Sequence, residues 1–260
     1  MINKIKIHNE KSFEKMRVAG RLAADCLDYI TDFIKPGIST DEINNLCHEF
    51  QTNAGAKPAP LNYKGFPKSV CTSVNHVVCH GIPGKKTLKE GDIINIDVTP
   101  ILNGWHGDTS RMYYVGKVSL KAQKLVETTY EALMKGIEKV KPGNTLGDIG
   151  HAIQEFAEKK KYSIVREFCG HGLGEVFHDS PSILHFGKPG EGDVLQAGMF
   201  FTIEPMINIG DSRVKVLSDG WTAVTSDKSL SAQFEHSIGV TESGYEIFTK
   251  SKKKFTFPPY

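Results

Sequence analysis

Two kinds of segment recur along the chain at almost the same spacing, and this repetition constrains the fold more than any other feature. Residues 35–37, Lys-Pro-Gly, precede a segment with helical apolar periodicity, and the same three residue types precede another at 141–143, an offset of 106. Residues 91–97 and 198–204, at an offset of 107, each contain a glycine, an apolar run and a final carboxylate. One such match could be coincidental, but two at nearly one offset favour an internal duplication.

A duplicated chain predicts two related halves, here spanning roughly residues 35–115 and 141–240 of a single domain that covers 1–260. Asp97 and Glu204 end the repeated apolar runs. They would therefore occupy equivalent places and face each other across a pseudo-twofold axis.

Apolar residues at three- and four-residue intervals predict four helices. The expected ranges are 13–33, a segment after an N-cap at Thr40 that ends near Gly55, about 119–140, and a segment that starts near Thr145. Pro-Gly pairs follow the first and the third, as expected at helix ends.

Strands are predicted between and after these helices. Residues 56–68 are rich in Pro and Gly and predict a loop, whereas 69–80 are rich in Val, Thr and Cys. Residues 93–102 and 105–115 flank Asn103-Gly104, a strong signal for a tight hairpin. From 164 onward the pattern is mostly strand and turn, so the chain is expected to be a mixed α/β (α+β) protein.

The predicted hairpin places two acids on one face. A two-residue turn at Asn103-Gly104 pairs Thr99 with Asp108 and Asp97 with Ser110, so Asp97 and Asp108 are diagonal neighbours, about 7–8 Å apart at the backbone. Two carboxylates on an apolar hairpin are costly unless something neutralises them. Considered alone, the hairpin favours a simpler interpretation, in which Asp108 caps a turn and Asp97 ends a strand.

Further ionisable residues interrupt apolar segments in the second half. Glu204 lies in Phe-Phe-Thr-Ile-Glu-Pro-Met, Glu235 lies in Ala-Gln-Phe-Glu-His-Ser-Ile, and His80 ends an apolar strand. His171 and His178 belong to a segment whose glycines permit tight turns. A lone buried acid usually pairs with arginine, and a lone strand histidine is usually a core residue. Four acids and a histidine together are better explained as ligands of two divalent cations.

The chemistry of this ligand set limits the choice of metal. Carboxylate and imidazole without thiolate suit manganese, iron(II), cobalt or zinc, and disfavour calcium and magnesium. The five cysteines lack the C-x2–4-C spacing of a structural zinc site. The glycines at 170–174 match no phosphate-binding motif.

Composition excludes several other classes of protein. A net charge of +2 gives no overall field for nucleic acid. Residues 1–7 carry charges among their apolar residues, unlike a secretory signal, and no apolar run is long enough to span a bilayer. Five dispersed cysteines indicate a reducing compartment. We therefore expect a cytoplasmic protein that binds no membrane and no specific nucleic acid.

Seven stretches together resemble the type I methionine aminopeptidases of bacteria, and the resemblance covers essentially the whole chain. They are residues 63–75, 77–83, 91–97, 106–110, 169–174, 200–206 and 229–236. The resemblance implies the pita-bread fold, in which two pseudo-symmetric halves place their helices outside a curved antiparallel sheet. That architecture agrees with the repeat.

The resemblance also implies a role for individual residues. The metal ligands would be Asp97, Asp108, His171, Glu204 and Glu235, with Asp97 bidentate to one ion and Asp108 and Glu235 bridging both. His80 and His178 would contact substrate, and a pocket for the methionine side chain would comprise Tyr63, Phe66, Cys71, Phe177 and Trp221. Backbone carbonyls of Asn75, Val77 and Ser231 would hold one sodium or potassium ion.

Three residues depart from the family's pattern. His76 replaces a glutamate between the residues of the monovalent-cation loop and is expected to leave the chemistry intact. Pro60 and Lys64 stand where some bacterial members have cysteine and histidine, which puts the selectivity of the pocket rim in question.

The implied activity is removal of the initiator methionine from deformylated new proteins when the second residue is small. His178 and one ion would polarise the scissile carbonyl, Glu204 would carry a proton from water toward the leaving amine, and His80 would hydrogen-bond the scissile amide.

Two other hypotheses remain. A proline-specific peptidase of the same fold usually carries an additional N-terminal domain, which 260 residues are too few to hold. An inactive relative that binds ribosomes or other partners would have lost metal ligands, and all five are present. The basic run at 250–254 could make a transient ribosome contact, although short charged runs are usually only solvated. No apolar stripe suggests an interface, so a monomer is expected.

Overall fold

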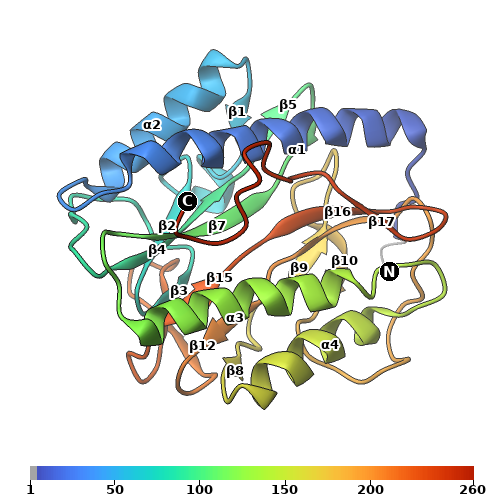
Figure 1. Ribbon diagram of the computed structural model, residues 1–260. Helices are drawn as coiled ribbons and strands as arrows, with labels where there is room; N and C mark the ends of the chain where they lie inside the picture. Colours follow the sequence, from blue (N-terminus) through green and yellow to red (C-terminus); the bar gives the residue numbers. More distant parts are fainter. Residues whose placement is uncertain (1–4) are drawn as a thin grey trace.

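The computed structural model describes residues 5–260, and each predicted helix is present (Figure 1). The helices are α1 (Glu10–Ile30), extended by the 3-10 turn η1 (Thr31–Phe33), α2 (Thr40–Asn53), α3 (Leu120–Ile137) and α4 (Leu146–Lys159). Residues 1–4 lie outside the described residues. The expected domain begins there, and so does the N-terminal segment that was predicted not to be a secretory signal.

One predicted helix cap is wrong. Ser39, not Thr40, is the N-cap of α2, because Ser39 has an extended backbone and its hydroxyl accepts the Glu42 N–H, while Glu42 bonds back to Ser39. The Thr40 hydroxyl instead donates to the carbonyl of Gly84. Thr145 and Asp148 form the same reciprocal capping box at the start of α4.

The strands are short and pair antiparallel throughout. In the first half they are β1 (Lys57–Pro58), β2 (Cys71–Val74), β3 (Val77–Cys79), β4 (Ile93–Val98), β5 (Pro100–Leu102), β6 (Trp105–His106) and β7 (Thr109–Tyr114). In the second half they are β8 (Ser163–Ile164), β9 (Gly170–Gly172), β10 (Asp179–Ile183), β11 (Phe200–Ile203), β12 (Met206–Asn208), β13 (Val214–Val216), β14 (Ala223–Thr225), β15 (Ser231–Gln233), β16 (His236–Val240) and β17 (Tyr245–Ile247).

Several predicted strands are interrupted. The expected strand at 69–80 is two strands, β2 and β3, because Asn75 adopts a left-handed turn with φ of 56°. The expected strand at 93–102 breaks at Thr99, and its partner breaks at residues 107–108. The expected loop at 56–68 contains β1 and the 3-10 turn η2 (Tyr63–Gly65). These breaks matter because they free side chains from the regular alternation of a strand.

The internal repeat is visible as recurring backbone hydrogen bonds. Gly37 donates to the carbonyl of Leu88 at 2.8 Å, and Gly143 donates to that of Leu195 at 3.1 Å. The N-caps Ser39 and Thr145 form equivalent bridges, to Thr87 and Val194. The triplet β2-β4-β7 in the first half corresponds to β9-β11-β16 in the second, with β4 and β11 as the middle strands.

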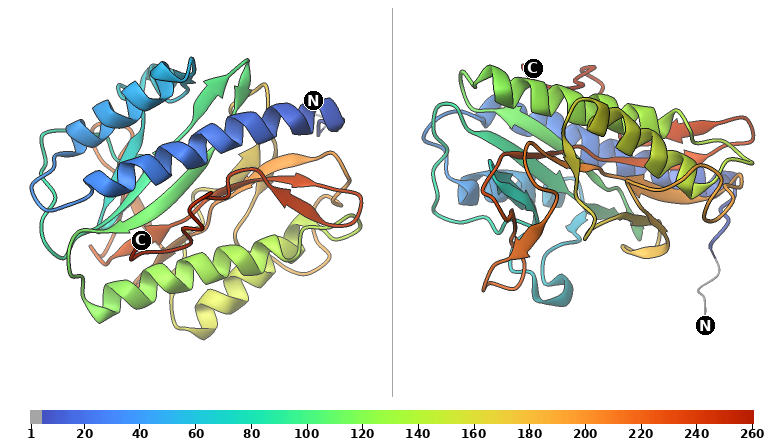
Figure 2. Two further views of the ribbon diagram at one scale, coloured as in Figure 1. Left: turned by 45° about the horizontal axis from the view of Figure 1, so that its top comes forward. Right: turned by 90° about the horizontal axis from the view of Figure 1, so that it is seen from below.

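Each half has its own pair of helices and its own apolar core. One core lies under α1 and α2 and includes Leu27, Ile43 and Ile96, whereas the other lies under α3 and α4 and includes Leu133 and Ile149. Viewed from below, α1, α3 and α4 lie on one side of the strands, and the loops that carry η2 (cyan) and β13 (orange) protrude on the other (Figure 2, right). The predicted α/β class with outer helices and antiparallel strands is therefore confirmed.

No helix among residues 5–260 is both long enough and apolar enough to cross a membrane.

A buried ion pair joins the two ends of the chain to the first half. Arg111 of β7 donates to Asp28 of α1 at 2.7 Å, and both side chains are only 6% exposed. Ser251, near the C-terminus, donates to the other oxygen of Asp28 at 2.8 Å. Separating the pair would leave a buried charge without water or a partner, which is costly. The pair therefore holds α1, β7 and the C-terminal segment together.

Replacing Arg111 with methionine should therefore lower the free energy of unfolding by about 3–5 kcal/mol, since Asp28 loses its partner while most of the side-chain volume is kept. Equilibrium urea unfolding at a fixed metal concentration measures the change. Asp25→Asn is the matched control, because Asp25 pairs with Lys252, which is 62% exposed, and should change stability by less than about 1 kcal/mol. Equal stability of the two variants would contradict the role given to the buried pair.

Candidate active site

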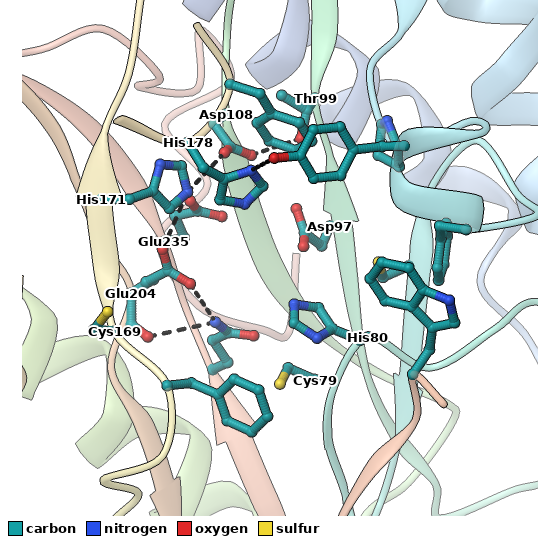
Figure 3. Close-up of a pocket in the computed structure, with 18 of the residues that line it drawn as sticks. Cys79, His80, Asp97, Thr99, Asp108, Cys169, His171, His178, Glu204 and Glu235 are labelled. Carbon is teal, nitrogen blue, oxygen red and sulfur yellow. Dashed lines mark hydrogen bonds and ion pairs between the residues drawn. The ribbon is translucent and has the colours of Figure 1, made fainter. Parts of the chain in front are cut away.

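All twelve residues expected around the divalent ions and the substrate line one cavity of about 360 Å³ (Figure 3). They are Tyr63, Phe66, Cys71, His80, Asp97, Asp108, His171, Phe177, His178, Glu204, Trp221 and Glu235. Both halves contribute side chains. The structure thus brings together residues as distant in sequence as Tyr63 and Glu235.

The two acids of the first half take their positions from the hairpin. The predicted register is confirmed: Asp97 pairs with Ser110 and Leu102 pairs with Trp105. Asp108 lies in the break between β6 and β7, opposite Thr99, whose hydroxyl donates to Asp108 Oδ1 at 2.7 Å. Of the simpler interpretation of the hairpin, Asp97 does lie next to the end of β4, but Asp108 accepts from a side chain and caps no turn. Both acids line the cavity, and Asp108 is only 3% exposed.

Glu204 and Glu235 also lie where strands are interrupted. Glu204 is in the gap between β11 and β12, and Glu235 is in the gap between β15 and β16. The hydroxyl of Thr202 donates to Glu204 Oε1 at 2.7 Å, and the amide of Gln233 donates to Glu204 Oε2 at 3.2 Å. His185, which is fully buried, accepts the backbone N–H of Glu204 at Nε2, 3.1 Å away.

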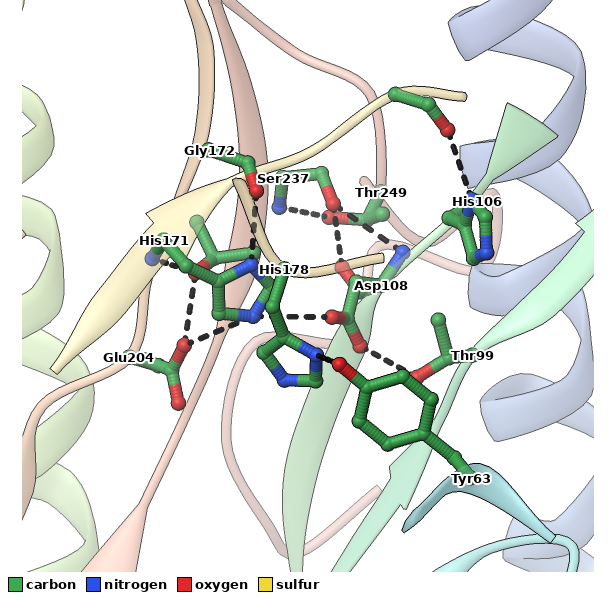
Figure 4. A network of polar contacts seen from close by, with 12 residues as sticks. Tyr63, Thr99, His106, Asp108, His171, Gly172, His178, Glu204, Ser237 and Thr249 are labelled. Atoms are coloured by element: carbon green, nitrogen blue, oxygen red, sulfur yellow. Dashed lines mark hydrogen bonds and ion pairs between the residues drawn. The ribbon is translucent and has the colours of Figure 1, made fainter. Parts of the chain in front are cut away.

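His171 projects from β9 between these acids. Its Nδ1 lies 3.1 Å from the carbonyl of Gly172, which can only accept, so Nδ1 carries the proton and Nε2 has a free lone pair. Nε2 lies 3.5 Å from Asp108 Oδ2 and 3.6 Å from Glu204 Oε1 (Figure 4). This tautomer is the one that a histidine needs to ligate a metal from Nε2.

Gly174 lies in a bend with a φ of 150°, as predicted for the glycines of this segment, but the two glycines beside His171 serve a different purpose. Gly170 and Gly172 lie within strand β9 and do not form turns. A Cβ on Gly170 would overlap the carbonyl of Thr202, and one on Gly172 would overlap that of Ser180. Their absence of side chains lets neighbouring backbones approach His171 closely.

Burial dominates the electrostatics of the acids. It raises the pKa of Asp97, Glu204 and Glu235 well above their usual values, and the charge of Asp108 raises all three further. Burial also raises the pKa of Asp108 to about 7. Among residues 5–260, no lysine or arginine forms an ion pair with any of these four acids. A cluster of this kind calls for a cation to neutralise it.

The residues present fit a divalent metal centre. Asp108, His171 and Glu235 each offer one ligand atom, and these atoms lie within 4.8 Å of one another. Asp97 Oδ1 is buried without a hydrogen-bond partner, so one of its oxygens remains for a cation. Burial lowers the pKa of His171 to about 4, which keeps its imidazole neutral.

The other end of the cavity is apolar and aromatic. Phe66 lies edge-on to Trp221, with ring centroids 5.2 Å apart, and His80 lies edge-on to Trp221 at 6.1 Å. Burial raises the pKa of the Cys71 and Cys79 thiols, which keeps both uncharged. This end can therefore take an uncharged side chain of moderate size.

Two histidines lie between the acids and the apolar end. Burial lowers the pKa of His80, whose backbone has a left-handed φ of 55°. Burial, with the nearby His171, lowers the pKa of His178 to about 3, and Nδ1 of His178 lies 3.0 Å from Tyr63 Oη. Both rings are thus neutral and can donate one hydrogen bond each.

The residues expected to hold a monovalent cation lie outside this cavity. The carbonyl of Asn75 accepts the N–H of Ser231 at 2.9 Å, and Val77 pairs with Val224. Two buried oxygens, Ser231 Oγ and Asn208 Oδ1, have no hydrogen-bond partner, and their residues pair across β12 and β15. Unpaired oxygens in one place fit a hard cation.

The sequence analysis missed several residues that line the cavity or support its acids. Thr99 and Gln233 line it, Thr202 lies behind it, and all three hydrogen-bond carboxylates. Their spacing from the acids could have indicated them. Thr99 faces Asp108 in the hairpin register, while Thr202 and Gln233 each lie two residues before a candidate ligand. Nothing in the sequence indicated the remaining ones, which are Cys79, Glu167, Phe168, Cys169 and Met206 in the cavity wall and His185 behind Glu204.

Comparison with known proteins agrees with this geometry. The family model of metallopeptidase family M24 matches residues 14–242. The methionine aminopeptidase of Rickettsia prowazekii is 65% identical over 258 residues, 98% of this chain and 99% of that protein. The methionine aminopeptidase of Escherichia coli K12 is 51% identical over 250 residues, 95% of each chain.

Solved structures also match this chain, and they include methionine aminopeptidases at high identity and prolidases at low identity. The crystal structure of the Rickettsia prowazekii methionine aminopeptidase has a TM-score of 0.94 at 64% identity, covering 95% of this chain and 100% of that one. The prolidase of Pyrococcus horikoshii has a TM-score of 0.74 at 21% identity and is covered over 64% of its length, a likeness in fold alone.

These matches confirm the predicted pita-bread fold, and membership of a metallopeptidase family implies that divalent metal is bound. The chain belongs to metallopeptidase family M24, within which it is similar over its whole length to the methionine aminopeptidases of bacteria.

Proposed function

We propose that this protein removes the N-terminal initiator methionine from new polypeptides by hydrolysing their first peptide bond. The observation that carries the proposal is one cavity in which four buried acids and a histidine, three of them close enough to hold one ion, lie next to an aromatic pocket. Relatives named methionine aminopeptidase over the full length of the chain support it. The whole chain, 1–260, would act as one catalytic domain made of two repeated halves.

Two divalent ions would be held by Asp97, Asp108, His171, Glu204 and Glu235. Carboxylates and one imidazole suit manganese, iron(II), cobalt or zinc. Such ions supply Lewis acidity, which lowers the pKa of water toward neutrality and polarises a carbonyl group. Asp108 and Glu235, one from each half of the chain, would each contribute a carboxylate to this centre, and ligand atoms of both lie within 4.8 Å of one of His171.

Residues of the chain itself would transfer the proton of the attacking water and hydrogen-bond the substrate. Glu204, whose pKa burial raises, is suited to receive a proton from water and to return it to the leaving amine. His178 would donate a hydrogen bond to the oxygen of the scissile carbonyl, and His80 would hydrogen-bond the scissile amide. Both histidines would be neutral near pH 7, because desolvation lowers the pKa of His80 and desolvation with the nearby His171 lowers that of His178.

The aromatic end of the cavity would bind the methionine side chain. It is lined by Tyr63, Phe66, Cys71, Phe177 and Trp221, none of which carries a charge at neutral pH. The volume of about 360 Å³ is enough for the whole N-terminal residue. The second residue would lie beside the acids, where a bulky side chain is expected to clash. Blocked N-termini, including formylated ones, would be rejected because the free amine would have to lie among the ligands.

The remaining expectations become parts of this proposal. A sodium or potassium ion would lie at the carbonyls of Asn75, Val77 and Ser231, near the unpaired Ser231 hydroxyl. The enzyme would act as a cytoplasmic monomer on deformylated chains. Contact with ribosomes through the basic run at 250–254 would be limited, since Lys252 pairs with Asp25 and Lys253 with the Asp28 carbonyl.

Removing a ligand shared by the cluster should abolish activity. His171→Ala or Asp108→Ala is expected to lower kcat/KM for Met-Ala-Ser by at least about a thousandfold with metal present, because a ligand that no neighbour can replace is lost. Asp25→Asn, a surface acid of α1, should keep the activity of the unmodified protein. Full activity in either ligand variant, in folded protein with excess manganese, would refute the ligand assignment.

The substrate panel separates this function from its alternatives. Chelator-stripped protein should regain cleavage of Met-Ala-Ser on addition of manganese, iron(II), cobalt or zinc, and should not cleave acetyl-Met-Ala-Ser, Met-Leu-Ser or Ala-Pro. Release of methionine is measured by coupled oxidation or by chromatography. Cleavage of Ala-Pro in preference to Met-Ala-Ser would favour a proline-specific peptidase, and inactivity with every metal would favour a binding relative.

A further inference from the structure

The hydroxyl of Tyr63 is hydrogen-bonded to His178, a cavity histidine that is not one of the proposed metal ligands. His178 Nδ1 lies 3.0 Å from Tyr63 Oη, and the two rings stack with centroids 5.1 Å apart (Figure 4). Among the described residues, neither the Tyr63 hydroxyl nor the His178 ring has a second hydrogen-bond partner. Tyr63 therefore makes the one hydrogen bond that orients the His178 ring, which otherwise packs against the rings of His171 and Phe177, with centroids 4.3 and 4.1 Å away.

The hydrogen bond admits two arrangements with different consequences. If Nδ1 carries the proton and donates to the tyrosine oxygen, Nε2 presents only a lone pair to the cavity. If Tyr63 donates to Nδ1, the single proton of the neutral ring resides on Nε2. Only the second arrangement gives the cavity a donor for a carbonyl oxygen, and a neutral imidazole cannot supply that donor in the first.

The loop that carries Tyr63 is built to hold its ring in place. Asn62, Lys64 and Gly65 all have positive φ, of 66°, 47° and 89°. Left-handed backbone is costly for residues other than glycine and persists where the surroundings require it, commonly at functional sites. The loop is closed by hydrogen bonds from Asn62 to the carbonyl of Phe66 and from Phe66 to that of Tyr63, at 2.8 and 2.9 Å.

Neighbouring side chains also contact the Tyr63 ring. The ring of Phe177 lies 4.9 Å from that of Tyr63, and the Lys64 ammonium lies 5.3 Å from the Tyr63 centroid. The tyrosine ring is therefore in contact with an aromatic ring and with a cation. Its hydroxyl has little freedom to leave His178.

We propose that Tyr63 is a positioning residue: its hydroxyl donates to His178 Nδ1 and thereby keeps the imidazole proton on Nε2, facing the scissile carbonyl oxygen. This inference rests on the proposed function of His178 as a hydrogen-bond donor. It gives Tyr63 a task beyond forming a wall of the methionine pocket. A residue that is only a wall would not need its hydroxyl.

A double-mutant cycle tests the link to His178. Tyr63→Phe keeps the ring and removes only the hydroxyl, so it should lower kcat for Met-Ala-Ser on the order of tenfold and leave KM within about twofold. His178→Ala should lower kcat by roughly a hundredfold. In the His178→Ala background, Tyr63→Phe should have no further effect, because its target is gone. Tyr29→Phe, which alters a tyrosine packed on Phe33 and Phe50 outside the cavity, is the matched control.

The nitrogen chemical shifts of His178 provide a readout independent of activity. In zinc-loaded protein, long-range ¹H–¹⁵N spectra should show His178 with its proton on Nε2, and Tyr63→Phe should convert it to a mixture of both tautomers. Zinc is diamagnetic, so the site remains visible.

The outcomes separate this inference from the proposed function. An unchanged kcat in His178→Ala would remove the donor role and this inference with it. A fall in kcat in His178→Ala, with Tyr63→Phe unchanged in both kcat and tautomer, would overturn the role of Tyr63 alone. Equal losses from Tyr63→Phe in both backgrounds would also overturn it, because the hydroxyl would then act without His178.

Discussion

The structure depends on the burial of four carboxylates with no basic side chain to neutralise them. Asp97, Asp108, Glu204 and Glu235 line one cavity, and burial raises the pKa of each. A buried charge without a partner costs several kcal/mol, so such a cluster persists only if a cation or protons offset it. The buried basic residue Arg111 pairs with Asp28 instead. A divalent metal, which membership of the family implies, would neutralise the four acids.

The duplicated architecture is what gathers these acids from distant parts of the chain. Asp97 ends the middle strand of one half and Glu204 follows the middle strand of the other. Asp108 and Glu235 lie in strand breaks where the halves meet: the Glu235 N–H donates to the Ser110 carbonyl at 3.1 Å, and Thr109 donates to the Glu235 carbonyl at 2.7 Å. These two hydrogen bonds across the seam fix the separation of acids that come from different halves.

A second set of hydrogen bonds orients the ligands once they are gathered. Thr99 holds Asp108, and Thr202 and Gln233 hold the two oxygens of Glu204. The Gly172 carbonyl sets the tautomer of His171. On the other side of His171, the Tyr63 hydroxyl makes the one hydrogen bond of the His178 ring among the described residues. Orientation of this kind is as necessary as the ligands themselves, because metal affinity and catalysis both depend on geometry at the scale of about half an ångström.

Local sequence patterns were enough to predict much of the secondary structure. Helical periodicity, the Pro-Gly stops and the Asn103-Gly104 hairpin predicted the helices and the register of Asp97 with Ser110, because these depend on residues near one another in sequence. The choice of Ser39 over Thr40 as a cap, and the breaks in the strands at Asn75 and Thr99, followed from contacts that local pattern does not contain.

The same division applies to the site. The sequence by itself determined that acids and histidines interrupt apolar strands and that two of the acids end repeated segments, which is the pattern from which a metal site was predicted. Only the tertiary structure decided that residues from Tyr63 to Glu235 line one cavity, that His185 supports Glu204, and that Tyr63 bonds His178. The physical reason is that side-chain type and spacing report on local chemistry, whereas hydrogen bonds between segments far apart in the chain exist only after the two halves have closed on each other.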